Sequence, residues 1–170
     1  QQQQHGVSPR PAMDAAGWRR AVARDWRLLE QAPADVRGDR QVLLGVLGPS
    51  WGWALQLASP ELRADRELVL RAVREDGQTL QYAAPELRDD RVVVLETVKR
   101  NGFALKHASE ALRADAETVV EATVQSCGMA LEYAAPGLLA DRGFWLWLLR
   151  RFSRPLGRAL ERLPAALRGD

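Results

Sequence analysis

Hydrophobic and polar positions follow a helical pattern in this chain, and the pattern starts again about every 25 residues. Each period opens with an Asp, and apolar or small residues follow it at three, four, seven and eight positions. In the period that begins at Asp90 these residues are Val93, Val94, Thr97 and Val98. This spacing places them on one face of an α-helix. A second apolar cluster comes after a Gly, so each period predicts two short helices joined by a turn.

The repeated Asp divides the chain into units of similar length. It occurs at Asp14, Asp39, Asp65, Asp90, Asp115, Asp141 and Asp170, at intervals of 25 to 29 residues. The text between these positions recurs as well, since DRELVLRAVREDGQTLQYAAPELRD is followed directly by DRVVVLETVKRNGFALKHASEALRA. Self-similarity at a fixed period is the signature of stacked repeats. The six units are 14–38, 39–64, 65–89, 90–114, 115–140 and 141–169.

Local signals support both ends of the first helix in each unit. The Asp is a favourable N-cap, because its carboxylate accepts hydrogen bonds from the free amide groups of the first turn. We expect the helix to end at a Gly in the left-handed conformation, which Gly adopts without strain. These residues are Gly52, Gly77, Gly102, Gly128 and Gly157. The first unit has Trp26 there instead, which leaves its turn geometry open.

The second half of each unit supplies three further columns of apolar or small residues. A Leu column consists of Leu29, Leu55, Leu80, Leu105, Leu131 and Leu160. A small column follows it, with Ala32, Ala58, Ala83, Ala108 and Ala134, and Leu163 in the last unit. The last column is Val36, Leu62, Leu87, Leu112, Leu138 and Leu167. One such hairpin cannot bury both faces, whereas stacked hairpins share a continuous core. We therefore expect an all-α fold over 14–170, an α-solenoid of six stacked two-helix repeats, preceded by a disordered or extended segment at 1–13.

The unit resembles a repeat family of about 25 residues, the domain of unknown function 4116. The resemblance rests on the patterns D-R-x-x-V-x-x-A-V, N-G-x-A-L-x-x-A-S and E-L-R-x-D between Asp65 and Asp115. It covers 39–141 well, and 14–38 and 141–170 more loosely. The resemblance implies a helical repeat and a source among unicellular algae or other protists. It implies no established activity, so it supplies no site residues.

Composition excludes several classes of protein. Lys and Arg number 24 against 22 Asp and Glu, so the net charge of +2 does not fit a protein that coats DNA by its basicity. A single Cys excludes an internal disulfide framework and a Cys-rich zinc site. No stretch reaches the 18 or more apolar residues of a membrane span, which favours a soluble chain.

The residues that most often carry catalysis are few and isolated. His107 follows Lys106 and has no second ligand at metal-binding spacing, and Cys127 lies in an expected loop with no His nearby in sequence. Nucleotide-binding and zinc-protease motifs are missing from the sequence. We therefore expect no catalytic residue, no metal site and no cofactor. The Asp of each unit and the Arg two positions before it are interpreted as helix caps with neighbouring ion pairs; these Arg residues are Arg37, Arg63, Arg88, Arg113 and Arg168.

One pair of positions varies between units while the Leu column stays constant. The pair lies one and five residues after the Gly, on one face of the second helix. It reads Trp53 and Leu57, Gln78 and Tyr82, Phe103 and His107, and Met129 and Tyr133 in the four middle units. The end units have Arg27 and Gln31, and Arg158 and Arg162. Two interpretations stay open, namely packing between neighbouring repeats and a variable ridge that binds a partner.

The first helix of the last unit is apolar on all sides, from Phe144 to Leu149. Trp145 belongs to a core column, whereas Trp147 stands in a column that is otherwise polar or Gly. Three interpretations of this helix remain, which are local burial, a partner protein and a membrane interface. On the second and third, Phe144, Trp147 and Leu148 are candidate contact residues.

These observations favour a non-catalytic interaction or scaffold module that binds or decorates a larger protein assembly. A first alternative is an accessory subunit of an organellar membrane complex, in a plastid or mitochondrion. The apolar last helix favours it, as do a composition typical of GC-rich genes and a start without Met, which we interpret as a processed product. A second alternative is a binder of single-stranded nucleic acid, which the balanced charge disfavours.

Overall fold

The structure is a computed structural model that describes residues 13–151, and every regular element within this range is a helix. Long helices open the units: α1 (Ala15–Arg24), α3 (Arg40–Leu47), α5 (Arg66–Glu75), α7 (Arg91–Val98), α9 (Ala116–Gln125) and α11 (Arg142–Arg151). Short 3-10 helices follow: η1 (Trp26–Gln31), η2 (Trp53–Leu57), η3 (Gly77–Tyr82), η4 (Gly102–His107) and η5 (Met129–Tyr133). Single helical turns close the units: α2 (Ala34–Arg37), α4 (Pro60–Arg63), α6 (Pro85–Arg88), α8 (Glu110–Arg113) and α10 (Pro136–Leu139).

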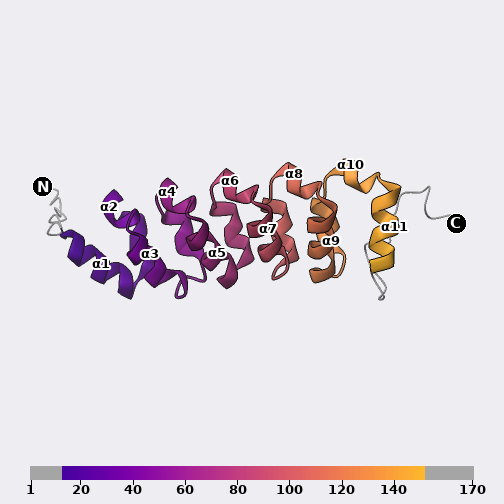
Figure 1. The fold of residues 1–170 in the computed structure, drawn as a ribbon. Helices are drawn as coiled ribbons and strands as arrows, with labels where there is room; N and C mark the ends of the chain where they lie inside the picture. Colours follow the sequence, from indigo (N-terminus) through magenta and orange to yellow (C-terminus); the bar gives the residue numbers. More distant parts are fainter. Residues whose placement is uncertain (1–12, 152–170) are drawn as a thin grey trace, which may run out of the picture.

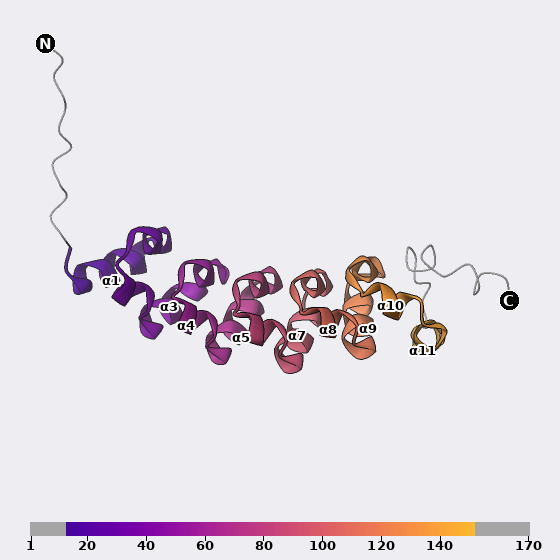
Figure 2. The same ribbon diagram turned by 90° about the horizontal axis from the view of Figure 1, so that it is seen from above.

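The units stack side by side into an elongated solenoid, as expected (Figure 1). The one-turn helices α2, α4, α6, α8 and α10 form a row along one edge. Long helices of neighbouring units contact one another, and so do neighbouring 3-10 helices, which gives two layers. Seen from above, the long helices follow one side of the array (Figure 2). A stack of this kind presents extended surfaces that repeat with the unit.

In the first five units the second helix is shorter and tighter than the hairpin pattern suggested. It is a 3-10 helix of five or six residues, and the chain then becomes extended at the small Ala, as at Ala83. A Pro or Glu after that extended segment begins the separate one-turn helix. Short 3-10 segments of this kind are used where a connection has little room.

The Asp that opens each unit caps its long helix, and from the second unit to the fifth it also contacts an Arg of the unit before it. Asp90 accepts hydrogen bonds from the amides of Val92 and Val93 at 2.8 and 3.1 Å, and from Nε of Arg66 at 3.0 Å. Arg40 contacts Asp65 in the same way, at 2.9 Å. We call this series the aspartate ladder; its pairs are Arg19–Asp39, Arg40–Asp65, Arg66–Asp90 and Arg91–Asp115.

The hydrogen bonds of the aspartate ladder lower the pKa of its carboxylates at Asp65 and Asp90. Partial burial raises the pKa of Asp65, but the hydrogen bonds from Arg40 and from the Leu68 and Glu67 amides outweigh it, so the pKa is lowered. Asp90 shows the same balance and the same direction. These carboxylates therefore stay ionised at neutral pH.

The expected core columns are buried in the described units. The Leu column is fully buried at Leu29, Leu55, Leu80, Leu105 and Leu131, and the small Ala column is buried beside it. Val36, Leu62, Leu87 and Leu112 are buried too, whereas Leu138 is half-buried. The remaining members, Leu160, Leu163 and Leu167, lie outside the described residues. So do 1–12 of the expected lead-in and the Gly157 turn.

The turn glycines serve two different purposes, and our expectation of a left-handed Gly in every unit is wrong. Gly52 and Gly128 have φ of 79° and 94°, as expected. Gly77 and Gly102 do not have positive φ. They are required for close approach, because a Cβ on Gly102 would lie 2.2 Å from the carbonyl oxygen of Ala122 in the next unit. Gly52 meets both requirements, since a Cβ there would lie 2.5 Å from the Ala72 carbonyl oxygen.

A side-chain cap starts the 3-10 helix in the units that lack the left-handed Gly. Asp76 accepts from the Gln78 amide at 2.8 Å, and Asn101 from the Phe103 amide at 3.1 Å. In the first unit Asp25 accepts from the Arg27 amide at 3.1 Å, so the unit with Trp26 keeps the same turn. In the first unit this position therefore takes a residue other than Gly, because no left-handed conformation is needed there.

Candidate functional site

The variable pairs form one continuous row along the 3-10 helices, and neighbouring units touch within it. We call this the variable row; it consists of Trp53, Leu57, Gln78, Tyr82, Phe103, His107, Met129 and Tyr133. The Trp53 ring packs edge-on against Tyr82 of the next unit, with 5.6 Å between ring centroids. Gln78 Oε1 lies 3.2 Å from His107 Nε2 one unit further on. The first member of one pair thus contacts the second member of the next.

Most side chains of the variable row are half-buried, so packing between repeats leaves part of each exposed. Met129 is more exposed, at 40%. Burial raises the pKa of Tyr82. A hydrogen bond with Glu132, together with burial and the Glu132 charge, raises the pKa of Tyr133. Packing between repeats therefore accounts for the buried part of the row.

His107 is neutral at physiological pH. Burial lowers its pKa to about 4, and the positive charges of Lys106 and Arg88 act in the same direction. Because the Gln78 amide oxygen accepts hydrogen bonds, Nε2–H of His107 is the donor in that contact. The side chain therefore acts as a hydrogen-bonding bridge between two units.

A second feature runs beside the variable row, on the one-turn helices. We call it the arginine column; it consists of Arg37, Arg63, Arg88 and Arg113. Each residue ends a one-turn helix, and its carbonyl oxygen accepts a hydrogen bond from the backbone of the next unit. The distances are 3.1 Å from Ser59 N to Arg37 O, 2.9 Å from Ala84 N to Arg63 O, 2.9 Å from Ser109 N to Arg88 O and 2.8 Å from Ala135 N to Arg113 O. Contacts between the repeats thus fix the backbone of the column.

The guanidinium groups of the arginine column have no hydrogen-bond or ion-pair partner among the described residues. Nε of Arg88 and of Arg113 is even buried without a partner. We expected these arginines to form the ion pairs around each Asp, and that expectation is wrong. The aspartate ladder uses Arg40, Arg66 and Arg91 instead. Each of these residues directly follows the Asp of its own unit and pairs with the Asp of the next unit.

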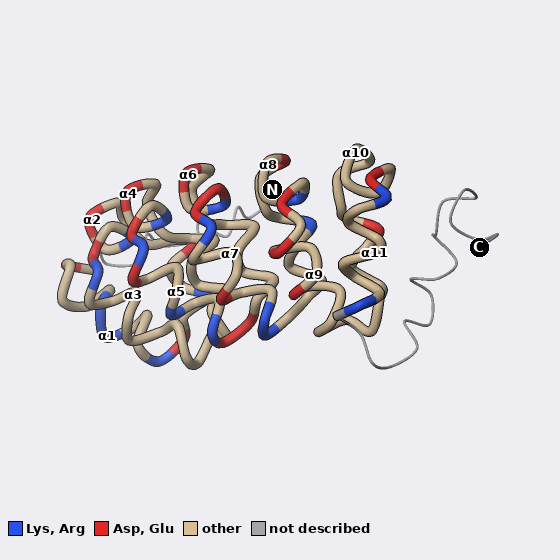
Figure 3. Tube along the Cα trace, turned by 45° about the vertical axis from the view of Figure 1, so that its right-hand side comes forward, with Lys and Arg blue, Asp and Glu red and all other residues tan. Residues whose placement is uncertain are grey.

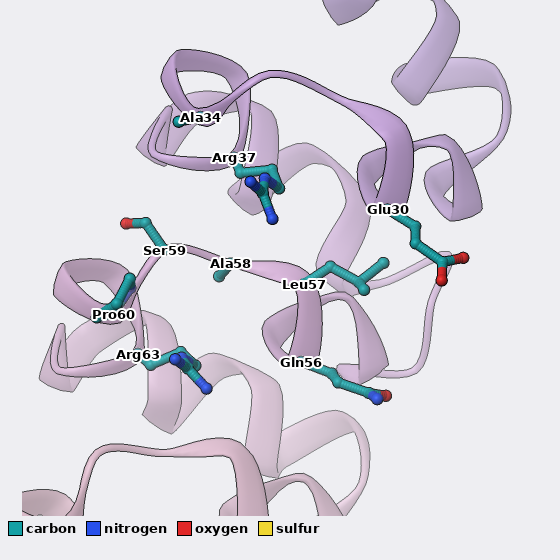
Figure 4. Close-up of a pocket in the computed structure, with 9 residues that line it drawn as sticks. All are labelled: Glu30, Ala34, Arg37, Gln56, Leu57, Ala58, Ser59, Pro60 and Arg63. Atoms are coloured by element: carbon teal, nitrogen blue, oxygen red, sulfur yellow. The ribbon is translucent and has the colours of Figure 1, made fainter.

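Clefts repeat between the arginine column and the variable row. One, of about 320 Å³, is lined by Arg37 and Arg63, with Leu57, Ala58 and Ser59 among the residues between them. Figure 4 shows both arginine side chains projecting in the same direction from successive units, with Arg37 above the segment Leu57–Ser59. The next cleft, of about 260 Å³, has equivalent residues one unit later and shares Pro60 and Arg63 with the first; its lining is Pro60, Arg63, Gln81, Tyr82, Ala83, Ala84, Pro85 and Arg88. The two clefts are therefore segments of one groove.

Comparison with protein families identifies this repeat. A family model described as "Domain of unknown function (DUF4116)" matches three overlapping segments, 49–88, 65–113 and 90–139. The chain belongs to the DUF4116 family. A comparison with curated proteins finds no match, and a comparison with solved structures finds none either.

The DUF4116 units place most of the predicted contact residues on the groove side of the solenoid. Leu57 and Tyr82 line the clefts directly, and Trp53, Phe103, His107, Met129 and Tyr133 lie in the same row. The arginine column was missed as a candidate binding feature. Its signal was the recurrence of Arg at the end of each unit, which the sequence does not distinguish from the Arg that begins the next helix.

The last described helix of the DUF4116 array divides the predicted contact residues differently. Phe144 and Leu148 are buried, at 3% and 0% exposure, so local burial, one of the three interpretations, applies to these two candidates and they belong to the core. Trp145 is fully buried as expected, and its Nε1–H donates to the Leu139 carbonyl oxygen at 2.7 Å. Trp147 remains 40% exposed on the other side of α11. No helix within residues 13–151 is long and apolar enough to cross a bilayer.

Proposed function

We propose that this chain is a non-catalytic repeat module that binds another protein along the groove between the arginine column and the variable row. The observation that carries the proposal is the difference between two arginine series in the same repeats. The arginines of the aspartate ladder have carboxylate partners, whereas the described partners of the arginine column are only backbone groups of the next unit. Arg63, Arg88 and Arg113 are half-buried, whereas Arg37 is exposed. Half-buried cations without a counter-ion are costly, so their recurrence in successive units favours a role in binding.

The groove combines this charge with apolar and amide groups, as protein interfaces do. Leu57 and Tyr82 supply apolar surface, and Gln56 and Gln81 supply hydrogen-bonding groups beside it. Aromatic residues and Arg are the residue types that most often dominate interface energy. The stack presents the same arrangement in successive units, which suits an elongated partner.

Site-specific photo-cross-linking in cells of the source organism tests this function. A photoreactive residue replaces Gln81 in the groove, and a control replaces the exposed Arg71 on the long helix α5. We expect a defined protein adduct from position 81 that disappears when Arg63→Gln and Arg88→Gln are added. The same adduct from position 71, or an adduct that nuclease destroys, would contradict the proposal. An adduct in an organellar membrane fraction would support the narrower proposal of an accessory subunit.

A further inference from the structure

The partner chemistry that fits the groove follows from its charge, and this step rests on the proposed function. Along the arginine column each unit presents one guanidinium that forms no ion pair with a described carboxylate. Packing holds these groups in place, as shown by the buried Nε atoms of Arg88 and Arg113. A fixed cation of this kind binds carboxylates and phosphates well, because its N–H groups need no further ordering.

The positive charge is strongest in the middle of the array. Gln56 and Gln81 line the two clefts, and the equivalent residues of the next two units are Lys106 and Glu132; Glu30 also lines the first cleft. Lys106 and Arg88 together lower the pKa of His107, after the larger effect of burial, so both positive charges act on the same point of the groove. An anionic partner is thus attracted to the units of Arg63 and Arg88 and discouraged at the two ends.

The spacing of the repeats suits an extended polypeptide. Packed helices lie about 8–10 Å apart. A chain in the extended polyproline II conformation rises about 3.1 Å per residue with three residues per turn, so every third side chain lies on the same face. Three residues of an extended partner therefore advance by about one unit of the solenoid. A partner with an acidic residue at every third position places one carboxylate at each arginine of the column.

The rim of the groove favours discrete carboxylates over a continuous phosphate backbone. Glu61, Glu86 and Glu110 are exposed on the one-turn helices, so acidic and basic positions alternate along this edge (Figure 3). A hydrogen bond with Ser59 lowers the pKa of Glu61, with its own backbone amide and Arg63 contributing less, so this carboxylate is ionised. Nucleic acid carries a charge on every nucleotide and is repelled by such a rim.

We infer that the groove binds an extended acidic segment of a partner protein, with one carboxylate side chain at each of Arg63, Arg88 and Arg113. The apolar surface at Leu57 and Tyr82 then contacts the residues between the acids. Register, and not only total charge, determines the affinity of such a segment.

Fluorescence anisotropy with synthetic peptides tests the register. The probe is a labelled peptide of four Glu-Ser-Gly triplets, and the control has the same composition with its four Glu residues adjacent. At about 0.05 M salt, where screening is weaker than at physiological ionic strength, we expect the spaced peptide to bind at least about fivefold more tightly. Equal affinity for the two peptides, or tighter binding of a labelled oligothymidylate, would overturn the inference.

Paired variants test which arginines carry the binding. Arg63→Gln with Arg88→Gln is expected to weaken the spaced peptide at least about tenfold. Arg66→Gln with Arg91→Gln removes the same charge from the aspartate ladder and is expected to change affinity less than about threefold. Equal losses in both variants would show a general charge effect and refute the assignment, with circular dichroism confirming that each variant is folded. If the cross-link at position 81 forms while the peptides show no preference, the proposed function stands and this inference fails.

Discussion

Gly102 lies so close to Ala122 of the next unit that a Cβ added to it would stand 2.2 Å from the Ala122 carbonyl oxygen. The Gly102 amide also donates to Gln125 Oε1 of that unit, at 2.6 Å. The two units therefore meet backbone to backbone at this point. Gly102→Ala is expected to lower the free energy of unfolding by about 1–3 kcal/mol, because the carbonyl group must move aside. Urea unfolding of the purified protein measures the change.

Gly45 provides a matched control for that substitution. It lies within the helix α3, and a Cβ added there meets no atom within 4 Å. Gly45→Ala is expected to stabilise the protein by about 0.5–1 kcal/mol, since Ala restricts the unfolded chain more than Gly does. A loss of stability in both variants would refute the view that the contact with Ala122 is what requires Gly at position 102.

Asp90 is expected to contribute more to stability than its ion-pair partner. Asp90→Ala removes the cap of α7 and the contact with Arg66 together, and should cost about 1–2 kcal/mol. Arg66→Ala removes only the contact between partly exposed groups and should cost less than about 1 kcal/mol. Glu75→Ala, at an exposed position without a described partner, serves as the charge control and should change stability by less than about 0.5 kcal/mol. Chemical denaturation of the three variants and the double variant Asp90→Ala with Arg66→Ala separates the two roles.

The two tryptophans of α11 should respond in opposite ways to truncation. Trp145→Ala removes a fully buried ring and is expected to cost about 3–5 kcal/mol. Trp147→Ala removes a ring that is 40% exposed and is expected to cost less than about 1 kcal/mol. Hydrogen exchange of the α11 amides reports the loss locally. Equal protection losses would place Trp147 in the core and remove it as a contact residue.

His107 makes stability depend on pH in a defined window. Its pKa is about 4 in the fold against 6.5 for an ordinary His, so the unfolded chain binds more protons between these values. Stability is therefore complete above about pH 6.5 and is lost as the pH falls toward 4. His107→Gln should flatten this part of the profile. Urea midpoints at several pH values test it, and parallel profiles for both proteins would contradict the assignment.

The aspartate ladder responds in a lower and separate range. The pKa of Asp65 and of Asp90 is lowered in the fold from the ordinary value of 3.8, so their contribution is complete above that value. It is lost as the pH falls below 3.8. A second decline in stability at that acidity, present in both the wild-type protein and His107→Gln, is the expected signature.

The solenoid could be predicted from the sequence because the residues that determine it act locally and recur in each unit. The Asp cap depends on one side chain and the next three residues, and the Leu column depends on burial that recurs in each unit. The turns were harder to predict, because Gly77 and Gly102 are required by contacts with atoms of the following unit and not by their own backbone conformation. No pattern within one unit reports how closely its neighbour approaches.

Only one side of the groove could be predicted from the sequence, for a related reason. The variable row can be recognised because its residues change from unit to unit. The two arginine series cannot be told apart in this way, since Arg63 and Arg66 have the same charge and lie three positions apart. The stacking direction decides that Arg66 meets Asp90 while Arg63 stays beside the cleft. In α11 the core positions three, four and seven residues after Asp141 are Phe144, Trp145 and Leu148, and these are the buried ones. The all-round apolar sequence left the role of this helix open, although the register of the repeat already gave its core face.

Each carboxylate of the aspartate ladder caps one helix and binds an Arg of the preceding unit, so it links the unfolding of one repeat to that of its neighbour. Asp90 closes the start of its own helix and holds Arg66 of the preceding unit, so fraying of one repeat also removes a bond from its neighbour. In a linear array, intrinsic repeat stability and the nearest-neighbour interface are the two terms that set cooperativity. The Asp90 carboxylate contributes to both terms. We expect boundaries between folded and unfolded repeats to be costly, so that the central units melt together rather than one at a time.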